Sequence, residues 1–145
     1  MKVKLLASGA QRSHALVFDR GEEVMEGMRA FAREHGITAA RFTAIGAFSD
    51  LTLGYFDWQR KEYEQIKLDE QVEVLTLAGD VALTDEGPDV HAHVVVGKRD
   101  ATAHGGHLME AHVRPTLEVI LDESPGHLRK RSDPESGLAL IDPEA

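Results

Sequence analysis

The chain contains no cysteine among its 145 residues. Disulfide bridges and thiolate metal ligands are therefore excluded, and a transition-metal site would have to use histidine, carboxylate, carbonyl or water ligands. The sequence contains eight histidines, which makes imidazole the leading candidate ligand. The lack of cysteine also fits a reducing compartment without proving one.

Long apolar runs are missing as well. The apolar patch near the N-terminus stops at Gly9, which is too short for a signal peptide. No segment approaches the roughly 20 apolar residues that are needed to cross a bilayer. We therefore expect a soluble, cytoplasmic protein with no membrane partner.

Positive charge is in the minority, because 16 Lys and Arg face 25 Asp and Glu and give a net charge of −9. DNA affinity comes largely from basic side chains that neutralise phosphates, so this balance argues against a free-standing DNA-binding protein. The basic run Arg129-Lys130-Arg131 could contact phosphate, but beside Asp133 and Glu135 it is more typical of a solvated face.

Familiar catalytic motifs are also lacking. There is no Gly-x-Ser-x-Gly nucleophile elbow and no glycine-rich loop that would cradle a phosphate. The sequence therefore leaves open whether the protein catalyses a reaction.

The length of 145 residues fits one domain with a single core. We expect that domain to cover residues 1–132, with residues 133–145 as a C-terminal tail that adds a short closing strand at 138–141. One helix is predicted over residues 22–35, because Val24, Met28 and Phe31 recur at helical spacing and Gly36 follows as a stop signal.

The rest of the chain is predicted to form strands separated by short turns. Because the turns are too short for repeated crossover helices, the sheet should be largely antiparallel, although the strand after the helix could pair in parallel with an earlier one. The predicted fold class is α/β (α+β), a largely antiparallel mixed sheet packed with one main helix. The predicted strands cover residues 4–6, 14–18, 40–47, 51–57, 73–83, 90–96, 101–108 and 117–122.

Three histidines stand out in two of these strands. His91 and His93 are two residues apart, so on a strand they face the same side about 6.6 Å apart, close enough for two imidazoles to reach one ion. Alone, a His-x-His pair is more often two polar residues on a half-solvated face. His107 follows at hairpin distance within Gly105-Gly106-His107 and is the candidate third ligand.

The turn between the two strands decides whether His107 joins the pair. A two-residue turn at Arg99-Asp100 would place His107 opposite Ala92, on the wrong face. A three-residue loop, or a bulge at Gly105-Gly106, shifts the register by one residue and brings His107 to the side of His91 and His93. We predict such a loop or bulge.

Several blocks of the chain resemble the plants-and-prokaryotes conserved (PPC) domain, which in plant nuclear proteins is attached to AT-hook motifs. The likeness covers nearly the whole chain, and spaced motifs in the right order are more specific than any one of them. The blocks are His-Ala-His-Val-Val-Val-Gly at 91–97, Gly-Gly-His-Leu at 105–108, Thr-Leu-Glu-Val-Ile-Leu at 116–121, the run from Phe42 to Asp57 and the run from Glu73 to Val81.

This resemblance implies a mixed α/β domain that assembles as a homotrimer and, as in many prokaryotic members, binds a metal ion, most simply zinc, through His91, His93 and His107. The Arg-Gly-Arg-Pro AT-hook is absent, which weakens the transfer of DNA binding from the plant members. The resemblance also favours a place near the site for Glu118, which could orient a ligand histidine or accept a proton. Without the resemblance, the sequence predicts only a surface charge at Glu118.

Three functional interpretations remain. The first is a metal-binding trimer with an open position for a small ligand. His112 and Arg114 are two residues apart and could line one face, where a cationic side chain would suit an anionic ligand. The second is a DNA-binding transcriptional regulator. In the third, the metal ion is purely structural and holds a hairpin or a subunit contact.

Overall fold

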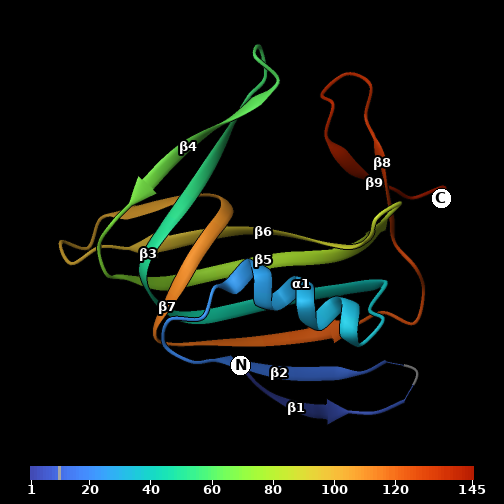
Figure 1. The fold of residues 1–145 in the computed structure, drawn as a ribbon, viewed down its shortest axis with the longest axis horizontal. Helices are drawn as coiled ribbons and strands as arrows, with labels where there is room; N and C mark the ends of the chain where they lie inside the picture. Colours follow the sequence, from blue (N-terminus) through green and yellow to red (C-terminus); the bar gives the residue numbers. More distant parts are fainter. Residues whose placement is uncertain (10) are drawn as a thin grey trace.

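The computed structural model describes residues 1–9 and 11–145, and these form one large sheet and one helix (Figure 1). The helix α1 covers Val24–Glu34. The strands are β1 (Lys2–Ala7), β2 (Ser13–Phe18), β3 (Ala39–Asp57), β4 (Glu62–Leu68), β5 (Val72–Thr84), β6 (Gly87–Gly97), β7 (Ala103–Glu123), β8 (Arg129–Ser132) and β9 (Ala139–Asp142).

The nine strands follow the order β1-β2-β7-β3-β5-β8-β9, with β4 paired to β3 and β6 paired to both β5 and β7. β3 and β7 are long enough to pair with different neighbours along their lengths. As a result β3, β5, β6 and β7 each pair with two others of this set and close a ring. These four strands supply most residues of the apolar core, and the β6–β7 hairpin pairs with β5 on one side and with β3 on the other.

The predicted antiparallel character is confirmed, with one correction. β3, the strand that follows the helix, pairs antiparallel with β4, β5 and β7. The parallel contact that the structure describes is instead between β5 and β8, where Leu83 faces Arg129. The expectation of a parallel pairing for the strand around Ala40 is therefore wrong. The register of a long two-sided strand depends on partners distant in sequence, which local turn lengths do not reveal.

Helix α1 lies on the core face of the sheet, as its pattern predicts. Val24, Met28 and Phe31 are buried, and the chain leaves the helix through Gly36 at φ +61°. At its start, the carboxylate of Glu23 accepts hydrogen bonds from the backbone N–H groups of Met25 (3.1 Å) and Glu26 (2.5 Å).

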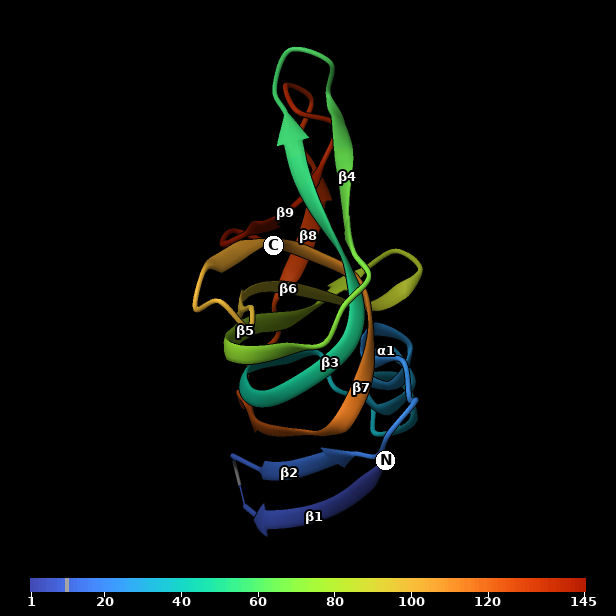
Figure 2. The same ribbon diagram turned by 90° about the vertical axis from the view of Figure 1, so that its left-hand side faces the viewer.

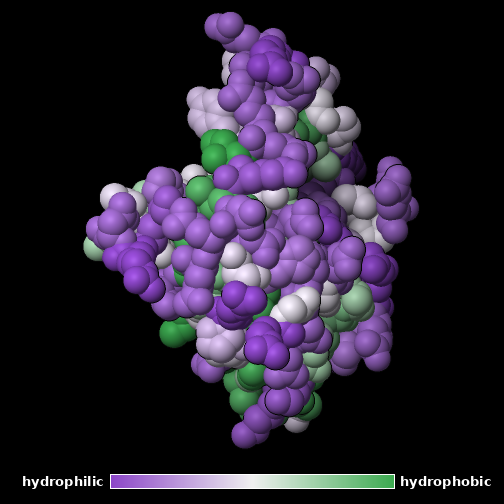
Figure 3. Space-filling model, turned by 60° about the vertical axis from the view of Figure 1, so that its left-hand side comes forward, coloured by the Kyte–Doolittle hydropathy of each residue, from purple (hydrophilic) through white to green (hydrophobic). Residues whose placement is uncertain are grey.

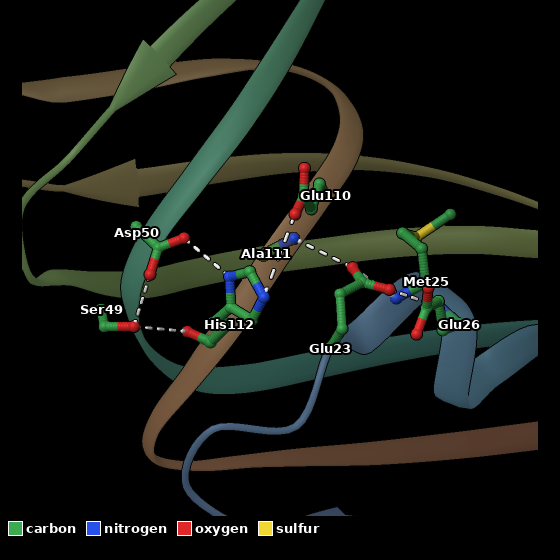
Figure 4. A network of polar contacts seen from close by, with 8 residues as sticks. All are labelled: Glu23, Met25, Glu26, Ser49, Asp50, Glu110, Ala111 and His112. Atoms are coloured by element: carbon green, nitrogen blue, oxygen red, sulfur yellow. Dashed lines mark hydrogen bonds and ion pairs between the residues drawn. The ribbon is translucent and has the colours of Figure 1, made fainter.

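The same Glu23 carboxylate joins the helix to the sheet (Figure 4). It also accepts a hydrogen bond at 3.1 Å from the backbone N–H of Ala111 in β7. The backbone of Glu23 forms an isolated bridge with His112, and the His112 Nδ1 lies 2.7 Å from Asp50 Oδ1 in β3. One acidic side chain thus fixes where α1 begins relative to β7.

Two hairpins rise from the same end of the molecule, β3–β4 and β8–β9 (Figures 1 and 2). β9 is the closing strand that the sequence predicts near residues 138–141. The side of the molecule drawn in Figure 3 is largely hydrophilic, with hydrophobic side chains in separate spots. No helix within residues 1–9 and 11–145 is long and apolar enough to cross a bilayer.

Candidate metal centre

Strand β6 presents its two histidines on one face. Val90, Ala92 and Val94 are buried in the core, so the alternating residues His91 and His93 face the opposite side of the sheet. Period-two alternation of this kind follows from the pleat of the strand. The apolar half of β6 therefore sets the direction of both imidazoles.

His107 in β7 joins this face because of the register of the hairpin. His93 pairs directly with His107, and Val94 with Gly106. The last cross-strand bond of the hairpin runs from Lys98 N to Thr102 O at 2.9 Å, which leaves a three-residue turn at 99–101 with Ala101 at φ +65°. The predicted three-residue loop is confirmed, and it is this loop rather than a bulge that sets the parity.

Gly105 and Gly106 have a different role from the predicted bend. A Cβ on Gly105 would lie 2.9 Å from the carbonyl oxygen of Val94, and one on Gly106 would lie 3.0 Å from that of Gly54. The two glycines therefore allow β7 to lie closely against β6 on one side and β3 on the other. This close fit holds His107 beside its two partners.

The three imidazoles form a compact group. One nitrogen from each ring lies within 4.8 Å of the others, and the Nε2 atoms of His91 and His93 are 3.1 Å apart. The ring centroids are separated by 5.0 Å for His91–His93, 5.1 Å for His91–His107 and 5.4 Å for His93–His107. Three nitrogens at such spacings can share one ion at zinc–nitrogen distances of about 2.0–2.1 Å after small side-chain adjustments.

The electrostatics of the group favour the neutral imidazoles that metal ions require. Burial, with a further contribution from the neighbouring His91 and His93, lowers the pKa of His107 from 6.5 to about 4. Burial also lowers the pKa of His93, and His91 adds to this shift. The buried Nδ1 of His107 has no hydrogen-bond partner among the described residues. Neutral donors converging in one place, with a polar atom unsatisfied, fit a bound cation.

Asp80 supports this group from β5. Its Oδ2 lies 3.5 Å from His91 Nδ1, and its Oδ1 lies 3.7 Å from the Nζ of the nearly buried Lys130. Burial acts to raise the pKa of Asp80, but His91 and Lys130 outweigh it and hold that pKa below 3.8. Carboxylates in this position fix the orientation of a ligand histidine and increase its basicity.

Asp80 lies within the strand predicted at 73–83 and was not among the site residues expected from the sequence. The signal was present, because residues 84–87 form a tight turn and Asp80 is then the partner of His91 across the β5–β6 hairpin. The expectation that Arg129-Lys130-Arg131 forms a solvated face is wrong for its central residue. Lys130 is only 7% exposed, and its Nζ lies 2.9 Å from Asp89 Oδ2.

A cavity of about 420 Å³ opens beside the histidines, a size within the range of small-molecule sites. Its walls come from the two protruding hairpins as well as from the sheet. The ring of Tyr63 in β4 lies against that of His107, with centroids 4.7 Å apart and planes tilted by 37°, and residues 138–141, most of them in β9, also line the cavity. Burial raises the pKa of the Tyr63 phenol, which keeps its hydroxyl proton available for donation.

The structure keeps the other candidate residues apart from this group. Glu118 is exposed on the outer face of the sheet opposite Ile45 and lines a separate cavity of about 610 Å³. It is not among the groups that offer a ligand atom with the three histidines. His112 is engaged by Asp50, and neither it nor Arg114 lines the cavity beside the histidines. Within one chain, none of these residues reaches the candidate centre.

Residues 6–125 match the sequence profile of the Plants and Prokaryotes Conserved (PCC) domain, the family abbreviated PPC above. The chain belongs to the PPC domain family. No protein of curated function matches it.

Solved structures of similar proteins have the same fold over nearly the whole chain. A PPC protein from Pyrococcus horikoshii is 33% identical, covers 97% of this chain and 94% of its own, and superposes with a TM-score of 0.86. A metal-containing protein from Archaeoglobus fulgidus is 34% identical over 97% and 99% of the two chains, with a TM-score of 0.83. A suggested DNA-binding protein from Bacteroides thetaiotaomicron is 26% identical over 99% of both chains, with a TM-score of 0.88.

Proposed function

We propose that this PPC protein binds one divalent metal ion per chain through His91, His93 and His107. The observation that carries the proposal is the convergence of three nitrogens, one from each ring, within 4.8 Å. The similar Archaeoglobus protein is described as metal-containing, which supports the proposal. Zinc fits a set of neutral imidazoles best, although other divalent transition metals accept the same ligands.

The open side of the centre faces the cavity, so we propose that the ion keeps a position for a small ligand. Three protein ligands with one free position are typical of catalytic rather than closed structural zinc sites. A metal ion held this way supplies a Lewis acid that polarises an oxygen-containing group. Tyr63 and Asp80 would hold the ligand set in place, Tyr63 by packing its ring against His107 and Asp80 through His91.

Elemental analysis tests the proposal directly. Protein without a histidine tag, purified without added metal, should contain about one transition-metal ion per chain. His91→Ala, His93→Ala and His107→Ala should each lower the content severalfold or more. His104→Ala is the matched control, because His104 is exposed, lies three residues before His107 in β7 and pairs with Val96. This variant should leave the metal content unchanged. Full metal content in all three variants would contradict the proposal.

We also propose that the chain forms the homotrimer that the family resemblance implies. Large apolar side chains lie on the outer face of the sheet, where Ile45 is 61% exposed, Leu75 54% and Ile120 45%. Exposed apolar groups gathered on one face indicate a contact surface. A cytoplasmic location stays a prediction.

DNA binding is the second candidate, since a DNA-binding role has been suggested for the similar proteins from Bacteroides thetaiotaomicron and Ralstonia eutropha. The charges of this chain favour it less. Arg129 lies 2.9 Å from Asp85, Lys130 2.9 Å from Asp89, and Arg131 3.2 Å from Asp142, so the basic run is largely neutralised within the chain. Retardation of duplex DNA at low salt would support this function, and its absence would exclude it.

A purely structural metal ion is the third interpretation. It predicts that chelation separates the trimer into single chains and that no added small molecule ever binds beside the histidines. A ligand site predicts the reverse, that the trimer survives chelation while ligand binding is lost. Light scattering before and after chelation distinguishes the two.

A further inference from the structure

A larger cavity of about 720 Å³ adjoins the one beside the histidines, and Arg29 of helix α1 lines both. The two cavities also share Asp89, Lys130 and Ala139. The metal centre therefore does not face an isolated pocket. It faces a cavity that shares four wall residues with a larger one, which lies between α1 and β8.

Basic side chains outnumber acidic ones in the larger cavity, five to three. Most of these charges are already paired with one another or with a neighbour. Arg129 pairs with Asp85, Lys130 with Asp89, and Arg131 with Asp142 outside the cavity. Their contribution to an incoming charged group is correspondingly small.

Three of these charged side chains, Arg29, Arg33 and Glu86, take part in no ion pair or side-chain hydrogen bond among residues 1–9 and 11–145. The two arginines are unpaired although the chain carries a net charge of −9. They are four residues apart on α1, so their side chains leave the same face of the helix about 6 Å apart along its axis. Arg29 is half-buried, which removes much of its solvent. Two unpaired guanidinium groups on the wall of one cavity present a site for an anion.

From this arrangement we propose that the ligand of the metal centre is a small organic anion, a carboxylate or a phosphate ester. Arg29, assisted by Arg33, binds its charged group. The rest of the molecule extends toward His91 and His107. This assignment rests on the proposed metal function, because the centre supplies the second point of attachment.

The fold holds the arginines in register with the metal centre. Glu23 fixes the first turn of α1 to β7 through Ala111 N, and β7 also carries His107. Arg29 stands less than two helical turns beyond that anchor. The anion site and the third histidine are therefore both positioned by one strand.

Titration calorimetry of zinc-loaded protein at low ionic strength tests the proposal. The probes are inorganic phosphate and succinate, which separate the two sources of negative charge, with uncharged succinamide as the neutral analogue. We expect at least one anion to bind, typically with a millimolar dissociation constant, and succinamide to bind no better than background. Arg29→Gln should weaken binding about tenfold and Arg33→Gln severalfold, as expected for loss of a charged hydrogen bond. Arg20→Gln, at an exposed turn outside both cavities, should have no effect.

Metal content measured on the same samples separates the two proposals. A protein with full metal content that binds neither anion, or that binds them equally well after Arg29→Gln, would overturn the anion site alone. If the zinc-treated protein retains no metal but still binds an anion in an Arg29-dependent way, the metal centre is overturned and the anion site is retained. Circular dichroism of Arg29→Gln checks that α1 is intact, so that weaker binding reports on the side chain.

Discussion

Asp80 and His91 lie directly opposite each other in the β5–β6 hairpin, with 3.5 Å between Asp80 Oδ2 and His91 Nδ1. The other oxygen of this carboxylate faces Lys130. Lys130 therefore contacts Asp80, and Asp80 contacts His91, which is part of the candidate metal centre. This order leaves His91 Nε2 directed toward His93, at 3.1 Å from its Nε2.

Removal of this carboxylate should weaken metal binding. We expect Asp80→Ala to lower the zinc affinity by about 10- to 100-fold, because the orientation and basicity of His91 both depend on it. Competition with a chromogenic chelator measures the change. Asp69→Ala, an exposed carboxylate outside the site, is the control. An unchanged affinity would show that His91 is held by other contacts.

The anchor of helix α1 should contribute to stability. Glu23→Ala removes an acceptor from Met25 N, Glu26 N and Ala111 N together, so we expect a loss of about 1–2 kcal/mol in the free energy of unfolding. Urea denaturation gives the value. Glu26→Ala, in the first turn but without these bonds, should cost less, and equal losses for both variants would argue against the anchoring role.

The pair His112 and Asp50 predicts a pH dependence of stability. The hydrogen bond that His112 donates to the Asp50 carboxylate raises the pKa of His112 above 6.5. Burial opposes ionisation of Asp50, but bonds from Ser49 and His112 lower its pKa below 3.8. The contribution of His112 to the free energy of unfolding is therefore complete below pH 6.5, and it is lost as the pH rises through the pKa of His112 in the folded protein.

Conversely, the contribution of Asp50 is complete above pH 3.8 and is lost as the pH falls through its folded pKa. Wild type should exceed His112→Gln in stability by more at about pH 5.5 than at about pH 8.5. Both side chains are more than a third exposed, so the difference should stay within about 1 kcal/mol. Urea curves at the two pH values measure it, and an equal gap at both would contradict the pairing.

Gly79 should tolerate no side chain. A Cβ there would lie 2.3 Å from the carbonyl oxygen of His91 and 2.3 Å from Cζ of Phe42, so β5 and β6 would have to separate. We expect Gly79→Ala to cost about 2 kcal/mol or more and to lower metal content by displacing His91. Gly126→Ala, with open space around it, is the matched control. A Gly79→Ala protein as stable as wild type would show that β5 and β6 can move apart at this position without loss of stability.

The outer face of the sheet should carry the subunit contact. Ile45→Asp places a charge among exposed apolar residues, and we expect the trimer to dissociate to single chains in light scattering. Ile66→Asp alters another exposed apolar residue, in β4 and 48% exposed, and should leave the trimer intact. Dissociation by the second variant alone would move the contact to the β3–β4 hairpin.

The sequence predicted those elements whose own pattern determines them. The helix expected at 22–35 is α1, and the strand expected at 90–96 lies within β6. The convergence of His107 with His91 and His93 followed from strand parity together with the predicted three-residue loop. Local rules were sufficient because all three residues belong to one hairpin.

Elements that depend on distant partners were harder to predict. The strands expected at 40–47 and 51–57 are one continuous β3, and those expected at 101–108 and 117–122 are one β7. β4 and β8 were missed because most of their residues are polar or charged, which hides the apolar alternation of a strand. Lys130 is buried only because Asp80 and Asp89 meet it from other strands, and no local pattern indicates that meeting.

Ring closure among β3, β5, β6 and β7 leaves only three described strands with a single partner, namely β1, β4 and β9. An unpaired rim invites strand addition by another chain unless charges or bends discourage it. Lysines alternate along β1 at positions 2 and 4, and glutamates along β4 at 62 and 64. Growth into fibrils by edge-to-edge pairing is thereby disfavoured, and copies of this chain would meet through the broad surface of their sheets.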